Sequence, residues 1–156
     1  MKAELKLLEP LSYSADLVID TTRSSVHQLR EQLRARVEPR SQNRLSILFE
    51  SFGYKHGIPG GADFVFDART LPNPYWVSAL APLTGLDPPV IRFLEAEDSV
   101  ITLLQDIQSF IERRIPLYEA HNRAYLTVAI GCTGGQHRSV YLVERLAEHF
   151  SPRHPN

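Results

Sequence analysis

The sequence predicts an α/β fold in which helices flank a partly parallel sheet, because strand-like and helix-like segments alternate along the chain. Three short apolar or alternating runs are typical of strands: residues 44–51, 62–67 and 124–130. Three runs carry apolar residues at helical spacing: residues 88–96, 99–120 and 140–150. Ligands of such sheets bind at the carboxyl ends of the strands, so we expect a site where three loops leave the sheet: residues 52–62, 68–76 and 131–137.

The composition is that of an ordinary globular domain. The chain has 156 residues, of which 43% are hydrophobic and 22% charged, and its net charge is −1. A near-neutral chain has no global basic field of the kind that attracts nucleic acid. Cys132 is the only cysteine, which excludes an intramolecular disulfide. There is no apolar run of about 20 residues and no signal-peptide core, so we expect a cytoplasmic protein.

The first 43 residues are predicted to form a short segment of their own. Residues 16–20 have the pattern of a strand, and Val26, Leu29, Leu33 and Val37 mark one face of a helix. The polar, proline-containing residues 38–43 are then a linker. We therefore expect a boundary that separates residues 1–43 from a main domain at residues 44–156.

Prolines and caps shape the expected connections of the main domain. Pro72 and Pro74 predict a rigid, non-helical segment between the second strand and the helices. Asp87 is a fitting N-cap for the helix at 88–96. The long helix at 99–120 has one apolar stripe, and Pro116 is expected to kink it or end it early.

The most informative stretch is residues 131–139, Gly-Cys-Thr-Gly-Gly-Gln-His-Arg-Ser, which we call the glycine loop. A buried strand precedes it and an amphipathic helix follows, so backbone N–H groups and the positive end of the helix dipole point into the loop. Arg138 adds a permanent charge whose planar fork suits phosphate or carboxylate. The loop is therefore predicted to bind an anion.

Cys132 and Arg138 also have the Cys-x₅-Arg spacing of cysteine-dependent phosphatases, in which a thiolate attacks phosphorus. A thiol at this place is acidified by the helix N-terminus and by the nearby cation. Those enzymes normally carry a histidine just before the cysteine, where this chain has Gly131. The alternative interpretation is that Cys132 is a small buried residue at the end of a strand.

Four further side chains are candidates for the same site. His137 is a cation for the anion, a donor to a sugar, or a solvated residue. Asp67 accepts hydrogen bonds from a sugar or an ammonium group, acts as an acid, or only initiates a turn. Arg69 is a second anion contact or a surface charge, and His56 reaches the site from its loop or is solvated. The aromatic residues Tyr54, Tyr75 and Trp76 are interpreted as packing residues rather than stacking platforms. Cys132 and His137 alone are too few ligands for zinc.

The chain resembles the C-terminal domain of the RNase adapter protein RapZ family. The resemblance rests on motifs that follow in order across residues 44–150: 49–57, 67–74 with Trp76, 83–87, 122–135 and 137–141. Residues 7–37 resemble the end of the family's N-terminal domain. The family's nucleotide-binding half, with its phosphate loop, is not among these residues, so we expect neither ATP nor GTP binding and no cofactor.

The resemblance implies a regulatory sensor and adapter rather than an enzyme. Family members bind glucosamine-6-phosphate through this domain, and enteric members present small regulatory RNAs to an endoribonuclease in the control of amino-sugar synthesis. A homo-oligomer is also expected. Carried over by position, the pocket consists of ten residues of this chain: Cys132, Thr133, Gly134, Gly135, Gln136, His137, Arg138, His56, Asp67 and Arg69. Gln136 replaces a basic residue that is usual in the family, Tyr75 replaces a histidine of enteric members, and residues up to Asn156 lack their basic tail.

Overall fold

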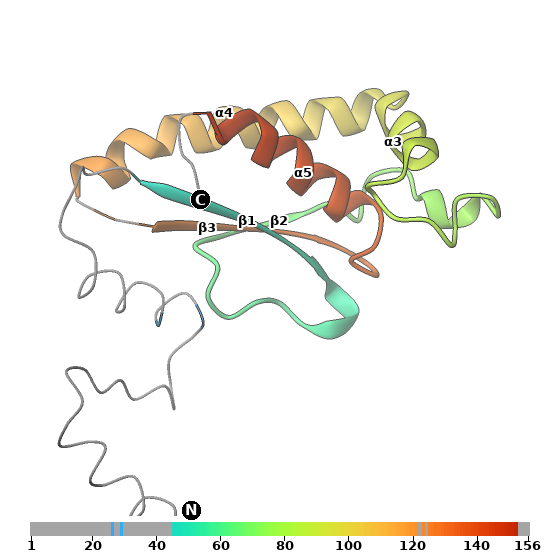
Figure 1. Ribbon diagram of the computed structural model, residues 1–156, viewed down its shortest axis with the longest axis horizontal. Helices are drawn as coiled ribbons and strands as arrows, with labels where there is room; N and C mark the ends of the chain where they lie inside the picture. Colours follow the sequence, from blue (N-terminus) through green and yellow to red (C-terminus); the bar gives the residue numbers. More distant parts are fainter. Residues whose placement is uncertain (1–25, 27–28, 30–44, 122, 124, 153–156) are drawn as a thin grey trace, which may run out of the picture. The chain divides into compact units, whose positions relative to one another are not determined.

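A computed structural model describes residues 26, 29, 45–121, 123 and 125–152 of the chain (Figure 1). Apart from Val26 and Leu29, which are both helical, these residues belong to the second of two units into which the chain divides, Met1–Pro39 and Arg40–Asn156. The predicted strand at 16–20, the rest of the predicted first helix and the linker at 38–43 lie outside the described residues. The proposed boundary at residue 43 stays a prediction.

Among the described residues, three parallel strands form one sheet, which confirms the predicted α/β class. They are β1 (Ser46–Gly53), β2 (Phe64–Asp67) and β3 (Tyr125–Cys132), in the order β1-β3-β2. The last strand in sequence is therefore the central one, and almost all of it is buried, as its run of apolar and β-branched residues predicts. The register pairs Gly53 with Cys132 and Asp67 with Gly131, so all three strands end at the same edge of the sheet.

The helices α3 (Pro88–Glu95), α4 (Asp98–Ala120) and α5 (Arg138–Phe150) lie on one face of the sheet (Figure 1). The apolar stripe predicted for α4 faces the core, where Val100, Ile107, Ile111 and Ile115 are buried. Phe110 of α4 meets the rings of Phe64 and Phe66 edge to face, and Phe150 of α5 stacks on Phe49. Burial of these faces fixes α4 and α5 on the sheet.

The expectation for Pro72 and Pro74 was wrong, and the expectation for Pro116 was wrong as far as an early end of the helix is concerned. The segment after β2 is not wholly non-helical, because Pro74–Trp76 form a 3₁₀ turn, η2. Pro74 is the first residue of this turn, and its ring fixes φ near the value that a helical turn needs. Asn73 Oδ1 accepts a hydrogen bond from Tyr75 N–H. Helix α4 does not end at Pro116 but continues to Ala120. Its last turns are held by packing, since Ile115 is buried and Tyr118 contacts the Phe64 ring.

Asp87 occupies the predicted N-cap position of α3, but its side chain does not cap the helix. Its Oδ2 instead accepts hydrogen bonds from the backbone N–H and the hydroxyl of Thr84, and these bonds lower the pKa of Asp87. The carboxylate therefore closes the turn that leads into α3. In the described part of the chain, no helix combines the length and the apolar character needed to cross a membrane.

Candidate functional site

The loops that follow the three strands meet at the carboxyl edge of the sheet, as predicted. After β2, Ala68 N–H donates to Gly131 O at 2.8 Å. After β1, the chain forms a short 3₁₀ turn, η1 (Tyr54–His56), in which Lys55 N–H donates to Thr133 O at 3.3 Å. The glycine loop at the end of β3 is thus bonded to the loops on both sides of it.

Two glycines allow the backbone of β1 to approach the glycine loop closely. A Cβ atom on Gly53 would lie 2.7 Å from both C and O of Gly134. A Cβ atom on Gly135 would lie 2.7 Å from Gly53 N, and Gly135 has a φ of +73°, which side chains rarely adopt. No larger residue fits at either place without moving the backbone, so this contact fixes the path of the loop.

Cys132 lies inside the loop and is only 2% exposed. Its Sγ is 3.2 Å from Ser139 Oγ and accepts a hydrogen bond from Gly135 N–H at 3.2 Å. Burial raises the pKa of the Cys132 thiol, but the Ser139 and Gly135 hydrogen bonds and the Arg138 charge outweigh it and leave the pKa below its usual value. The thiol is therefore acidic for a buried group, and it is enclosed by its own loop.

The backbone of the glycine loop presents N–H groups that the fold does not use. Gly134, Gln136 and His137 have no acceptor for their N–H groups among the described residues. These groups immediately precede α5, a helix of 13 residues, so the positive end of its dipole adds to their field. Such an arrangement favours an anion.

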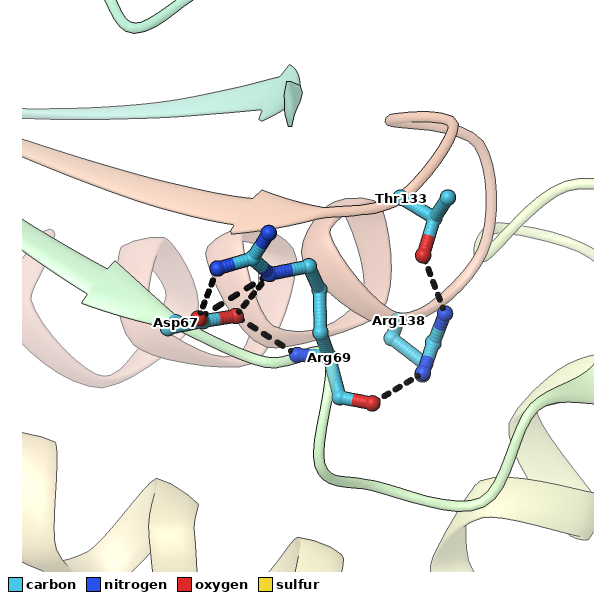
Figure 2. A network of polar contacts seen from close by, with 4 residues as sticks. All are labelled: Asp67, Arg69, Thr133 and Arg138. Atoms are coloured by element: carbon cyan, nitrogen blue, oxygen red, sulfur yellow. Dashed lines mark hydrogen bonds and ion pairs between the residues drawn. The ribbon is translucent and has the colours of Figure 1, made fainter. Parts of the chain in front are cut away.

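Arg138 is 4% exposed and ties two of the loops together (Figure 2). Its Nη1 donates to Arg69 O and to Leu71 O, both at 2.9 Å, and its Nη2 lies 3.4 Å from Thr133 Oγ1. Its Nε is buried without a partner among the described residues. Arg138 thus holds the segment after β2 with one end of its fork, while its buried Nε has an unused N–H.

The side chains of Gln136 and His137 are also bonded to that segment. Gln136 Nε2 donates to Leu83 O at 2.6 Å and to Ala81 O at 3.3 Å, and His137 Nε2 lies 3.1 Å from Leu80 O. His137 is 5% exposed, so it is not a solvated residue. Both side chains bond to the segment after β2, while their backbone N–H groups have no acceptor among the described residues.

Asp67 and Arg69 form a bidentate ion pair beside the loop (Figure 2). Arg69 Nη2 donates to Asp67 Oδ2 at 2.7 Å and Arg69 Nε contacts both carboxylate oxygens at 3.0 Å. The guanidinium also lies 3.7 Å from the centre of the Tyr54 ring. The two charges compensate each other, so the pair contributes shape and hydrogen bonds rather than net charge.

The Asp67–Arg69 pair predicts a measurable titration. Hydrogen bonds from the Arg69 side chain lower the pKa of Asp67, so NMR titration should place that pKa below the usual value of about 3.9. In Arg69→Ala it should return toward that value.

A lowered pKa means that the pair stabilises the fold above the unfolded-state pKa and that this contribution is lost as the pH falls through the folded-state pKa. The effect on stability should be small, because both side chains are well exposed. An unchanged pKa in Arg69→Ala would contradict the assignment.

The remaining predicted residues lie at the rim. Thr133 is exposed and near Arg138, whereas His56 is exposed at the end of η1 without a polar contact to the glycine loop among the described residues. Lys55, one residue earlier, was not among the predicted residues. Its Nζ lies 3.8 Å from the place that a Cβ on Gly134 would occupy, so it is the nearer cation. The only sequence signal for Lys55 was its position in the loop after β1. Ser139, which contacts Cys132 Sγ, was missed as well.

The aromatic residues of the loops do not share one role. Tyr54 is half-buried and packs against Phe52 at a centroid distance of 4.9 Å, as predicted. Tyr75 and Trp76 are 59% and 81% exposed, so their interpretation as packing residues was wrong. They lie on η2, where the 3₁₀ turn directs both rings away from the core and against each other.

The position before Cys132 leaves no room for the histidine of the phosphatase pattern. A Cβ on Gly131 would meet the rings of Phe52 and Tyr54, with Phe52 Cε1 at 2.8 Å. These rings occupy the place of a side chain there.

Comparisons with known proteins show the family of the chain. Residues 45–155 match the family model of the RapZ C-terminal domain. An RNase adapter protein RapZ of Yersinia pseudotuberculosis is 54% identical over 153 residues, which are 98% of this chain and 54% of that protein. Proteins named nucleotide-binding protein from Tolumonas auensis and Vibrio vulnificus are 55% and 53% identical over 96% and 95% of this chain. The chain spans about half the length of these relatives. It belongs to the family of the RapZ C-terminal domain.

Proposed function

We propose that this chain is a regulatory domain that binds a small phosphorylated amino sugar, of the glucosamine-6-phosphate type, at the glycine loop. The observation that carries the proposal is the set of unused N–H groups of Gly134, Gln136 and His137 at the start of α5. The buried Nε of Arg138 and the ammonium group of Lys55 add cationic donors beside them. These groups suit a dianionic phosphate.

The Asp67–Arg69 pair supports an amino sugar as the rest of the ligand. Asp67 lies at the end of β2, which is paired with Gly131 immediately before the loop. Its carboxylate is 40% exposed and stays ionised at neutral pH, since Arg69 lowers its pKa. An ammonium or hydroxyl group of a sugar held at the loop has a negatively charged acceptor within the same site.

The proposal is for binding rather than catalysis. Cys132 is enclosed by hydrogen bonds from its own loop, and one end of the Arg138 fork is bonded to backbone carbonyl groups. An in-line attack on phosphorus needs an accessible thiolate. If steady hydrolysis of an aryl phosphate were observed and were lost in Cys132→Ser, the chain would be a phosphatase instead.

Calorimetry tests the proposed binding. Titration of wild-type protein with glucosamine-6-phosphate should give a saturable heat, and Lys55→Ala should weaken the affinity about tenfold through the loss of one charge-assisted contact. Arg113→Ala, which removes an exposed cation on α4, is the matched control and should bind like the wild type. Higher salt should weaken binding, because the contacts are ionic.

One result would contradict the proposal, and two others would narrow it. Absence of heat with glucosamine-6-phosphate and with inorganic phosphate would exclude the site. Equal affinity of Lys55→Ala and the wild type would remove Lys55 from it. Inorganic phosphate alone, bound as tightly as the sugar phosphate, would limit the specificity to the phosphate group.

We further propose that the domain acts with an RNase partner and a small RNA. The support is the name RNase adapter carried by relatives such as that of Yersinia pseudotuberculosis. A gel shift with structured RNA that weakens as salt rises would support the RNA part, because phosphate contacts release counterions. A shift that is insensitive to salt would oppose it.

A further inference from the structure

Residues 69–85, which we call the strap, run from the end of β2 toward α3 and carry the exposed Tyr75 and Trp76. Figure 1 shows this segment at the same end of the sheet as the glycine loop. Leu71 and Leu80 anchor it in the core. Its hydrogen bonds to the rest of the domain all involve one short stretch of the glycine loop. Every hydrogen bond that the strap makes to described residues outside 67–91 ends on Gln136, His137 or Arg138.

These hydrogen bonds are spread over the whole strap. Arg138 holds its beginning through Arg69 O and Leu71 O, and His137 lies against Leu80 O. Gln136 holds its end, because its side chain donates to Ala81 O and Leu83 O and its own backbone carbonyl accepts Gly85 N–H at 2.9 Å. Three consecutive residues of the glycine loop therefore fix a segment of 17 residues.

The same three residues supply donors that the proposed function assigns to the anion. The N–H groups of Gln136 and His137 are unused, and Arg138 Nε is buried without a partner in the described residues. An anion that accepts hydrogen bonds from these groups restricts their backbone and side-chain motion. Each of these residues bonds to the anion with one group and to a carbonyl group of the strap with another. Ordering of the residue by the anion therefore also orders the strap.

We propose that anion occupancy of the glycine loop controls the order of the strap, and that Gln136 is the positioning residue that couples the two. This inference rests on the proposed function, because it needs an anion at the loop. Gln136 contacts the strap through its carboxamide and its carbonyl, and it contributes its N–H to the site. The exposed pair Tyr75 and Trp76 on η2 is the part of the surface that responds.

Hydrogen exchange measured by mass spectrometry tests the coupling, with inorganic phosphate and glucosamine-6-phosphate as probes. In the wild type, each probe should slow exchange in peptides covering 71–85 severalfold, while α3 and the middle of α4 are unchanged. In Gln136→Ala, exchange at 77–85 should be faster without a probe, and the slowing by the probe should be largely lost. Gln105→Ala on the exposed face of α4 is the matched control and should behave as the wild type.

A second variant and a second readout separate the outcomes. Gln136→Met keeps the length of the side chain without its donors. It should show the same faster exchange and the same loss of slowing that are expected for Gln136→Ala, and it serves as the test if the alanine variant folds poorly. Trp76 is the only tryptophan of the chain, so a change in its fluorescence with either probe reports on the strap directly.

Binding heat without any change in strap exchange or Trp76 fluorescence would overturn the coupling and leave the proposed function intact. Full slowing by the probe in both Gln136 variants would overturn the role of Gln136. No heat with either probe would overturn both proposals.

Discussion

Replacing Gly53 by alanine is expected to destabilise the fold by about 2–4 kcal/mol and to abolish anion binding at the glycine loop. Gly53 has ordinary extended backbone angles, φ −104° and ψ 124°, so the conformation itself does not require glycine. The loss of stability comes from steric overlap, because the new Cβ would lie 2.7 Å from Gly134 C and O and 3.0 Å from Gly135 N. These neighbours are backbone atoms that cannot rotate away, so the loop itself must move. Urea unfolding and calorimetry with glucosamine-6-phosphate measure the two effects.

Gly60→Ala is the matched control for Gly53→Ala. A Cβ on Gly60 would meet nothing within 4 Å, and Gly60 has no positive φ. This variant should stay within about 0.5 kcal/mol of the wild type and bind normally. If Gly53→Ala were as stable as Gly60→Ala, the close approach of β1 and the glycine loop would not be a requirement of the fold.

Removal of the Arg138 side chain is expected to cost a similar amount, about 2–4 kcal/mol, for a different reason. In Arg138→Ala, the carbonyl oxygens of Arg69 and Leu71 lose a charged donor at 2.9 Å, and a buried volume is left beside them. Anion binding should also be lost, because the same residue is the cation at the start of α5. Denaturant unfolding followed by circular dichroism, together with phosphate titration, tests both.

Arg138→Lys distinguishes charge from geometry at this position. Lysine keeps the positive charge, but one ammonium group cannot reproduce a planar fork that reaches two carbonyl groups and Thr133 at once. Its stability should therefore be close to that of Arg138→Ala, with some anion binding retained. Arg113→Ala on the exposed face of α4 is the reference for loss of a surface cation. Wild-type stability in Arg138→Ala would show that the contacts to the strap carry no net free energy.

The sequence predicted the architecture well because each element has a local signal. The run before Cys132 is apolar and β-branched, and it became the buried central strand. The apolar stripe of α4 matched its buried face from Val100 to Ile115. The meeting of three loops at one edge followed from the rule for parallel strands. The expectations from the prolines failed because tertiary packing holds the end of α4, and because the Asn73 side chain accepts a hydrogen bond from Tyr75 N–H in η2.

The details of the site were beyond the sequence because they depend on contacts between distant residues. The spacing of Cys132 and Arg138 indicates an anion site, but it does not show that the Arg138 fork is bonded to the carbonyl groups of residues 69 and 71. Nor does a pattern show that His137 turns toward Leu80 O. Lys55 was missed because nothing local separates a lysine near a loop from a solvated one, and only the fold brings its Nζ near Gly134.

The position of β3 between β1 and β2 has a consequence for how the chain acquires its site. Every parallel pairing between the described strands joins β3 to a strand that was synthesised at least 60 residues earlier, as in Asp67 with Gly131. Such distant pairings form slowly, because the intervening chain must close a large loop before any contact rewards it. The glycine loop takes its shape only after β3 has inserted, so anion affinity should appear as one of the last events in refolding. When phosphate is added at successive times during refolding, its binding should appear together with completion of the native sheet and not with early helix formation.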